Sequence, residues 1–267
     1  MKTRSPDDIP IPEIAVKRGD QFLALAQGLV EGFVGLLHYM AFIASAELAF
    51  AKLAIHGHDL LGDDEPERAF HDNSRRHFES LSRRLILVHS ITLVDAFISD
   101  LTTLLLISHP QTIAKDAEIK LGELLKLSSI DEAVTDMIKR RVRAISSESI
   151  RKRIRYLKTH FASAIHITDE QYSALETYTE ARNGAIHNWG PWELRWSPRG
   201  PVLEGIVGSS TKFEITKDFA QDALSNLMLF AASIIDGTAL VFSIDDDPRL
   251  LHIISWLKKD STSTESA

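Results

Sequence analysis

The chain has 267 residues, of which 44% are hydrophobic and 25% are charged, as is ordinary for a soluble globular protein. Lys and Arg number 30 and Asp and Glu 37, so the net charge of −7 argues against a surface that is basic throughout. There is no cysteine, which excludes disulfides, thiolate zinc sites and cysteine nucleophiles and fits a reducing compartment. The polar N-terminus does not resemble a secretory signal, so we expect a cytoplasmic protein.

Residues 1–18 contain three prolines and are predicted to form an extended arm. Residues 19–62 are predicted to hold an N-terminal helix, because apolar residues recur at helical spacing from Asp20 to Ile55. The most apolar stretch has fifteen residues between Glu31 and Glu47, fewer than the ~20 that a membrane span needs. We therefore expect a buried helix here and no association with a membrane.

A second long helix is predicted from about Pro66 to Ile107, with Pro110 ending it. Its second half is mostly apolar and contains Asp95. A lone buried carboxylate is costly. Asp95 is therefore expected either on the polar edge of the helix or, if it is buried, beside a cationic partner.

Three shorter helices are predicted at residues 121–127, 130–145 and 148–160, with Ser128-Ser129 and Ser146-Ser147 as cap candidates. The last two contain a strongly basic segment. Between Met137 and His160, nine Lys and Arg residues are opposed only by Glu148, so the segment carries +8 and the rest of the chain −15. This is a local electrostatic footprint on an otherwise acidic protein.

The next predicted helix starts at the Thr168-Asp169-Glu170-Gln171 cap and continues to about Asn188. Its expected inner face consists of Tyr172, Leu175, Tyr178 and Ile186. In residues 192–215, short stretches with a strand-like pattern of apolar and polar residues lie on either side of a turn that contains Pro and Gly. This pattern predicts a small β-hairpin insertion.

A helix from about Lys217 to Phe242 is predicted after the hairpin. A final helix is then predicted to begin at Asp245-Asp246-Asp247-Pro248 and to end at Lys258. The three aspartates suit a helix N-terminus better than a cation site. Residues 260–267 are predicted to be disordered. Without a repeat or a clear linker, residues 19–259 are expected to form a single domain.

The densest chemistry in the chain lies between Arg182 and His187. The Arg-x4-His spacing alone is weak evidence, because it recurs at Arg84–His89 and Arg155–His160 and because cations suit any helix C-terminus. However, Asn183 and His187 are four residues apart and share a helix face. Gly184 lies between them and costs about 1 kcal/mol relative to Ala, which indicates that another group approaches the backbone closely.

The stretch Arg182-Asn183-Gly184-Ala185-Ile186-His187-Asn188 resembles the signature of the HEPN superfamily, in which a histidine follows an arginine after four to six residues. The resemblance covers about Ser80 to Phe242 and leaves the N-terminal helix outside it. It implies an all-α, up-and-down helical bundle of the HEPN type, with the β-hairpin inserted after the motif helix and extra N-terminal helices. It also implies a homodimer in which the two motifs meet across a symmetric interface.

Many HEPN proteins are metal-independent endoribonucleases of toxin–antitoxin or antiviral defence systems. The resemblance therefore implies an RNA substrate, no cofactor, no metal, and an antitoxin or other neutralising partner. RNA cleavage by 2′-hydroxyl attack needs proton transfer near neutral pH, which suits His187, and a fixed cation on the phosphate, which suits Arg182. Asn183 is expected to orient His187 or the phosphate, and Asp95 to position Arg182.

The basic segment then becomes a candidate RNA track, although charged helices are usually only solvated. Its candidate RNA-binding residues are Lys139, Arg140, Arg143, Arg151, Arg155 and Lys158. Two alternatives remain open. The Arg/His cleft can serve a non-catalytic nucleotide- or RNA-binding module, or the motif can be a dimer-packing device.

Overall fold

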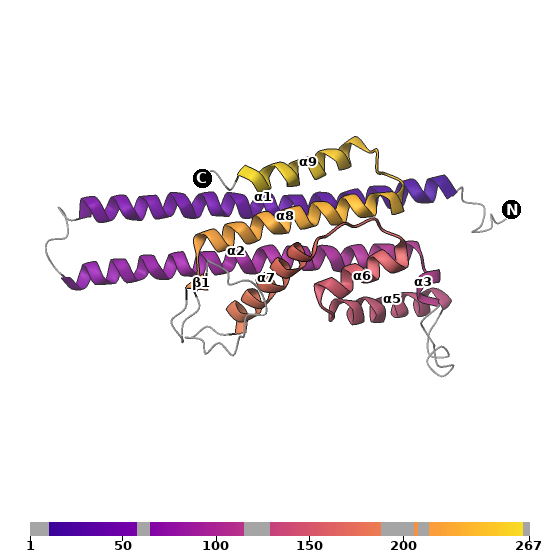
Figure 1. Ribbon diagram of the computed structural model, residues 1–267, viewed down its shortest axis with the longest axis horizontal. Helices are drawn as coiled ribbons and strands as arrows, with labels where there is room; N and C mark the ends of the chain where they lie inside the picture. Colours follow the sequence, from indigo (N-terminus) through magenta and orange to yellow (C-terminus); the bar gives the residue numbers. More distant parts are fainter. Residues whose placement is uncertain (1–10, 58–64, 115–128, 188–205, 208–213, 264–267) are drawn as a thin grey trace. The chain divides into compact units, whose positions relative to one another are not determined.

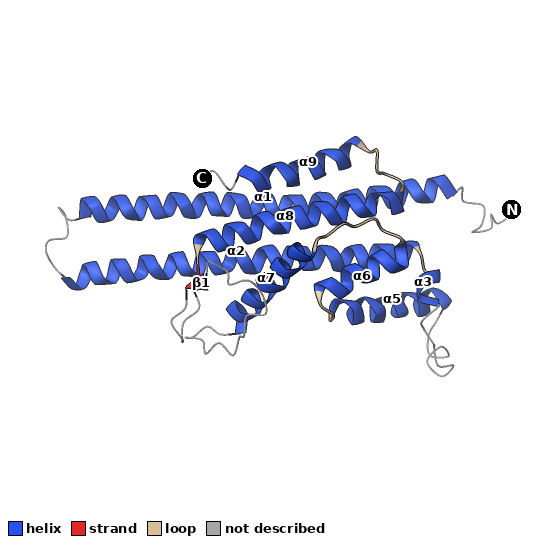
Figure 2. Cartoon of the chain, in the orientation of Figure 1, coloured by secondary structure: helices blue, strands red, loops and turns tan. Residues whose placement is uncertain are grey.

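The computed structural model describes residues 11–57, 65–114, 129–187, 206–207 and 214–263. Within them, only the backbone is described at residues 11–16, 50–51, 53–57, 65–72, 114, 187, 206–207, 214 and 260–263. The described chain is predominantly helical, which confirms the prediction of an all-α protein (Figure 2).

Figure 1 shows the described helices along the chain. In chain order they are α1 (Ile11–Gly57), α2 (Glu65–Ser108), α3 (Gln111–Ala114), α5 (Ile130–Ser146), α6 (Ile150–Phe161), α7 (Asp169–His187), α8 (Lys217–Ala239) with a 3₁₀ turn at Leu240–Phe242, and α9 (Pro248–Ser263). The predicted helices at 66–107, 130–145, 148–160 and 217–242 are thus confirmed to within a few residues, and the helix predicted at 20–55 is present but begins at Ile11. The predicted helix at 121–127 lies outside the described residues.

Both ends of the described chain are more helical than predicted. Helix α1 begins at Ile11, so the predicted extended arm is wrong over residues 11–18. The reason is that Pro12 lies in the first turn, where a backbone N–H would have no intrahelical acceptor. Helix α9 continues to Ser263, so the predicted disorder is wrong over residues 260–263, where no Gly or Pro interrupts the helix.

Serine caps mark the ends of the two basic helices. The Ser129 side chain accepts a hydrogen bond from the Glu132 N–H at 3.1 Å and caps the N-terminus of α5, as predicted. Ser147 is the C-cap of α5. The N-cap of α6 is Ser149, whose side chain makes no capping hydrogen bond.

Two short strands are described between α7 and α8. Strand β1 (Ile206–Val207) pairs antiparallel with β2 (Glu214–Ile215), and Ile206 is opposite Ile215. These four residues fall within the predicted hairpin of residues 192–215. The rest of that segment lies outside the described residues.

The described residues form two compact units, each assembled from segments that are distant in sequence. Of the described residues, the first unit draws on 11–30, 94–114, 129–168 and 229–259. Its core contains the stacked rings of Phe22 and Phe242, whose centroids lie 4.8 Å apart, and the fully buried Leu101, Ile154 and Phe230. The second unit draws on the described residues within 31–93 and 169–228, and on 260–263, and buries apolar residues of α1, α2, α7 and α8.

Two helical glycines lie where a neighbouring segment packs closely against the helix, one in each unit. A Cβ added to Gly237 on α8 would lie 2.4 Å from the backbone N and Cα of Ile165, and the Ala164 N–H donates to the Gly237 carbonyl at 2.7 Å. A Cβ added to Gly32 on α1 would lie 2.7 Å from a methyl group of Leu93 on α2. The backbone approach at Gly237 requires glycine, whereas at Gly32 the neighbouring atom is the end of a side chain.

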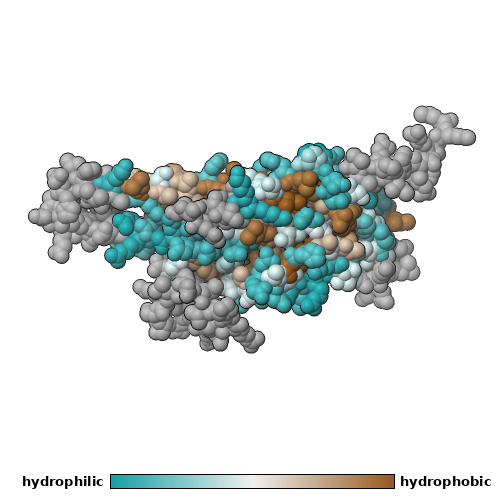
Figure 3. Space-filling model, turned by 45° about the horizontal axis from the view of Figure 1, so that its top comes forward, coloured by the Kyte–Doolittle hydropathy of each residue, from teal (hydrophilic) through white to brown (hydrophobic). Residues whose placement is uncertain are grey.

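Apolar side chains also reach the surface. On the face that Figure 3 shows, apolar patches interrupt a mostly hydrophilic surface. Phe42 and Leu48 on α1 are 63% and 57% exposed, so the predicted buried helix is covered on one side only. Three helical segments, Lys17–Ala49, Asn73–Ser108 and Lys217–Phe242, are long and apolar enough to cross a membrane by length and composition alone.

The length argument against a membrane span was therefore wrong. Helix α1 continues through Glu31 and Glu47, so its apolar segment is not limited to the fifteen residues between them. The expectations of a cytoplasmic location and of no membrane association stay predictions.

Candidate functional site

The motif helix α7 lies in the second unit and buries a stripe of residues spaced three apart. Leu175, Tyr178 and Ala181 are 2%, 4% and 6% exposed. Ile186, which was expected on the same inner face, is 37% exposed. It lies in the last turn of α7, beyond the covered part of the helix. The motif therefore begins next to the core and continues toward the surface.

Arg182 and Asn183 contact each other at the edge of this core. Nη1 of Arg182, which is half-buried, donates to Oδ1 of the exposed Asn183 at 3.0 Å. The Nε of Arg182 is buried and has no hydrogen-bond partner among the described residues. A guanidinium has five N–H donors, so Arg182 keeps donors that an anion can use.

His187 is the last residue of α7, and only its backbone is described. The helix is continuous from Arg182 through Gly184 to His187, which preserves the helical spacing on which the motif was argued. Asn183 was expected to orient His187 or a phosphate. Asn183 accepts a hydrogen bond from Arg182, and its expected role toward His187 or a phosphate stays a prediction.

Tyr178 fixes α7 against α8, one turn before Arg182. Nδ2 of Asn226 donates to the Tyr178 hydroxyl at 3.0 Å and to the backbone carbonyl of Asp222 at 2.8 Å. The ring of Phe219 meets the Tyr178 ring edge-on, with centroids 5.4 Å apart. Burial raises the pKa of the Tyr178 hydroxyl to about 12. Sequence analysis placed Tyr178 on the inner face but did not identify Asn226 as its partner.

Asp95, the fourth predicted site residue, lies on α2 in the first unit and binds Arg153 of α6. Nη1 of Arg153 donates to Oδ1 of Asp95 at 2.8 Å, and Nη2 donates to the Asp95 carbonyl at 3.0 Å and to Oγ of Ser99 at 3.2 Å. The Arg153 side chain is 5% exposed and that of Asp95 is 35% exposed. The expected cationic partner of Asp95 is therefore present, and it is Arg153. The expectation that Asp95 positions Arg182 stays a prediction.

The predicted RNA-binding residues lie on α5 and α6, also in the first unit. Arg140 pairs with Asp136 at 2.8 Å, and the neighbouring Lys152 pairs with Glu148 at 2.6 Å; all four side chains are exposed. Arg151 is half-buried. The remaining four are exposed and have no ion pair within the described chain; they are Lys139, Arg143, Arg155 and Lys158.

The aromatic side chains of this region are already in contact with one another. The Arg141 guanidinium lies 5.0 Å from the centroid of the Tyr156 ring, and its Nε donates to the Tyr156 hydroxyl at 3.4 Å. The His160 ring stacks on Tyr156 with centroids 4.0 Å apart. This cluster was not predicted, although the i, i+4 spacing of Tyr156 and His160 indicates a shared helix face.

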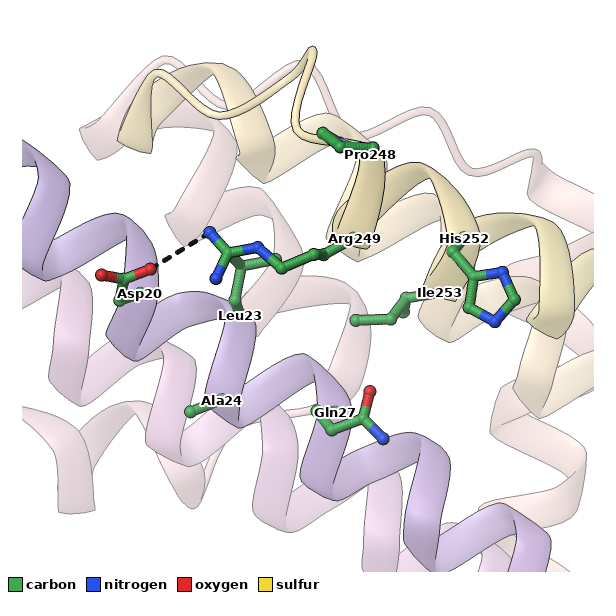
Figure 4. Close-up of a pocket in the computed structure, with 8 residues that line it drawn as sticks. All are labelled: Asp20, Leu23, Ala24, Gln27, Pro248, Arg249, His252 and Ile253. Atoms are coloured by element: carbon green, nitrogen blue, oxygen red, sulfur yellow. Dashed lines mark hydrogen bonds and ion pairs between the residues drawn. The ribbon is translucent and has the colours of Figure 1, made fainter.

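A pocket of about 800 Å³ lies between α1 and α9 in the first unit (Figure 4). Arg249 donates to Asp20 at 3.2 Å and to Asp247 at 2.7 Å, and its hydrogen bonds hold the pKa of the Asp247 carboxyl below its ordinary value. Asp247 also accepts from the Arg249 N–H, which confirms its expected role at the start of α9. The pocket lining includes none of the predicted site residues; it consists of Asp20, Leu23, Ala24, Gln27, Pro248, Arg249, His252 and Ile253.

Within the described ranges, no group of three or more His, Cys, Asp and Glu side chains is placed to hold a metal ion. Comparison of the chain with protein-family models, with curated proteins and with solved structures gives no match in any of the three.

Proposed function

We propose that the chain is a metal-independent endoribonuclease of the HEPN type, with Arg182 and His187 as its catalytic residues. The observation that carries the proposal is the half-buried Arg182 guanidinium, five residues before His187 on one continuous helix, with Nε buried and unpaired among the described residues. The guanidinium forms no ion pair among the described residues, so its Nη groups can donate to phosphate oxygens without first losing one there.

The proposed reaction forms a bond between the ribose 2′-oxygen and the adjacent phosphorus and breaks the bond from phosphorus to the 5′-oxygen. His187 removes the 2′-hydroxyl proton or protonates the leaving 5′-oxygen. Arg182 stabilises the negative charge on the phosphorane. Asn183 accepts a hydrogen bond from Arg182 and so helps to orient the guanidinium. The products are a 2′,3′-cyclic phosphate and a 5′-hydroxyl.

In this proposal two copies of the chain bring two Arg/His pairs into one site, as the HEPN resemblance implies. The chain would act in a toxin–antitoxin or antiviral system, with an antitoxin or other partner restraining it. The bundle would be of the HEPN type, with its hairpin after the motif helix. Asp95 would act on the fold of the first unit through Arg153.

The test is cleavage of labelled RNA by the full chain in the presence of a chelator. We expect His187→Ala and Arg182→Ala each to lower the cleavage rate by about 10²-fold or more. Arg84→Ala and His89→Ala are matched controls, because they remove the same residue types at the same spacing on α2, and they should leave the rate unchanged. A substrate with a 2′-deoxy sugar at the cleavage site should not be cut.

Equal cleavage by the parent and the two motif variants would overturn the proposal. If the parent does not cleave but binds a nucleotide or RNA end, and Arg182→Ala abolishes that binding, the chain is a non-catalytic binding module. If the parent neither cleaves nor binds and the motif variants become monomeric in size-exclusion chromatography, the motif is a dimer-packing device.

A further inference from the structure

Helices α5 and α6 carry exposed cations that the proposed cleavage reaction does not use. We propose that the outer surface of this helical pair binds the phosphate backbone of a polynucleotide, through Lys139, Arg143, Arg155 and Lys158. This proposal does not rest on RNA cleavage by Arg182 and His187. It concerns a separate binding surface with its own readout.

The way α6 is anchored determines which of its cations reach the surface. Its inner face consists of buried apolar residues and the buried Arg153, which Asp95 and Ser99 of α2 hold. Arg155 and Lys158 lie off this buried face and are exposed. Because Arg153 is fixed by hydrogen bonds, α6 cannot rotate about its axis without breaking them. The exposed cations are therefore held on one side of the helix.

The four cations form two pairs, each on one helix face. Lys139 and Arg143 are four residues apart on α5, about 6 Å along the axis, and Arg155 and Lys158 are three apart on α6, about 4.5 Å along the axis. All four are exposed and lack an ion pair within the described residues, so phosphate contacts would displace no carboxylate of that part of the chain. Displacing mobile counterions from the phosphates provides the free energy of binding.

The charge distribution of the chain favours a phosphate ligand at this surface. The segment from Met137 to His160 carries +8, whereas the rest of the chain carries −15. A polyanion is therefore attracted to this pair of helices and repelled by the chain as a whole. Carboxylates already engage the neighbouring Arg140 and Lys152, and these two residues provide internal controls.

The aromatic contacts indicate that this surface does not recognise the bases of a bound polynucleotide by stacking. Tyr156 is half-buried between helices, with Arg141 over its ring and His160 stacked on it, and Phe161 is 7% exposed. No other aromatic residue occurs on α5 or α6. Base stacking needs an open aromatic face. Binding should therefore depend on phosphate number and on salt, and not on sequence.

The experiment uses the full chain with His187→Ala, so that the probe stays intact. Binding of single-stranded RNA, double-stranded RNA and DNA of equal length is measured by fluorescence anisotropy across a series of salt concentrations. Two test variants, Lys139→Gln/Arg155→Gln and Arg143→Gln/Lys158→Gln, are compared with the control Arg140→Gln/Lys152→Gln. Each variant removes one Lys and one Arg, one from each helix, and circular dichroism checks that each is folded.

The affinity falls as salt rises, so the slope of log K against log salt is negative. We expect each test variant to reduce the magnitude of this slope by about 2, because each lost phosphate contact reduces it by about 1. The control should change the slope by less than about half of that, because its cations are already paired. Changing the base sequence at constant length should leave affinity unchanged, and comparing RNA with DNA identifies the preferred backbone.

Equal losses in test and control variants would overturn the proposal, since they would show only a general charge effect. The absence of binding to any polynucleotide, or binding only to vesicles of anionic lipid added as a competing probe, would also overturn it. Loss of RNA cleavage in the motif variants has no bearing on these outcomes. The two proposals can therefore fail separately.

Discussion

Arg153 and Asp95 are joined by two hydrogen bonds, one to the carboxylate at 2.8 Å and one to the backbone carbonyl at 3.0 Å. The contact links the middle of α2 to the second turn of α6. Arg153 belongs to the basic segment but, unlike the exposed cations there, its side chain is buried in the fold. The two residues therefore connect the basic segment with the apolar second half of α2.

Replacing Arg153 with Ala should destabilise the protein by about 2–3 kcal/mol. Removing one partner of a buried ion pair costs ~3–5 kcal/mol. The loss should be smaller here, because Asp95 is partly exposed and water can replace some of the hydrogen bonds that Arg153 donates to it. Urea unfolding, read as a shift of the midpoint at constant m-value, measures the change. Lys152→Ala, which removes an exposed ion pair from the same helix, should cost less than about 0.5 kcal/mol. Equal effects would contradict the buried role of Arg153.

Gly237→Ala should destabilise the protein by at least about 2 kcal/mol. The new Cβ would lie 2.4 Å from backbone atoms of Ile165, and backbone cannot move aside as a side chain can. Gly28→Ala on α1 is the control, because a Cβ there meets nothing within 4 Å. That substitution should stabilise the helix by up to about 1 kcal/mol. Thermal unfolding of the two variants should shift in opposite directions.

Tyr178 should make stability depend on pH in the alkaline range. Its pKa is raised from 10.0 to about 12 in the folded protein. The folded state therefore holds the phenolic proton more tightly than the unfolded state. The contribution of Tyr178 to stability should be constant below pH 10 and fall as the pH rises from 10 to 12. Tyr178→Phe should remove this component of the pH dependence. An unchanged profile in Tyr178→Phe would show that other groups cause the fall.

The two serines before α5 and α6 should differ in their contributions. Ser129→Ala removes a side-chain cap at 3.1 Å and should cost about 1 kcal/mol. Ser149→Ala removes a hydroxyl that makes no capping hydrogen bond and should be nearly neutral. Urea midpoints of the two variants, measured side by side, test the difference. A larger loss in Ser149→Ala would contradict the assignment of the caps.

Most helices could be predicted because their signals are local. Pro110 follows the end of α2, Ser129 caps α5, and the Asp247-Pro248 pair begins α9. The wrong prediction of an extended arm at the N-terminus also came from a local signal. Three prolines suggested an extended arm, but a proline in the first turn of a helix is compatible with it, and Pro12 lies there.

Tertiary contacts could not be predicted in the same way. Sequence analysis required a cation for a buried Asp95 and counted Arg153 among nine cations, but nothing local distinguishes Arg153 from Arg151 or Arg155. Only the packing of α6 on α2 selects it. The pairing of Tyr178 with Asn226 likewise depends on how α7 meets α8. At the motif, helical spacing predicted that Arg182 and His187 share one helix, which is the part that local periodicity controls.

The contact between Ala164 and Gly237 also has a consequence for the order of folding. These residues are 73 positions apart, so forming their hydrogen bond closes a long loop. The chain loses conformational entropy on this closure before packing contacts can compensate for the loss. Local helices form faster than such closures. The crossing of the segment after α6 over α8 should therefore form late, and a substitution at Gly237 should accelerate unfolding more than it slows folding.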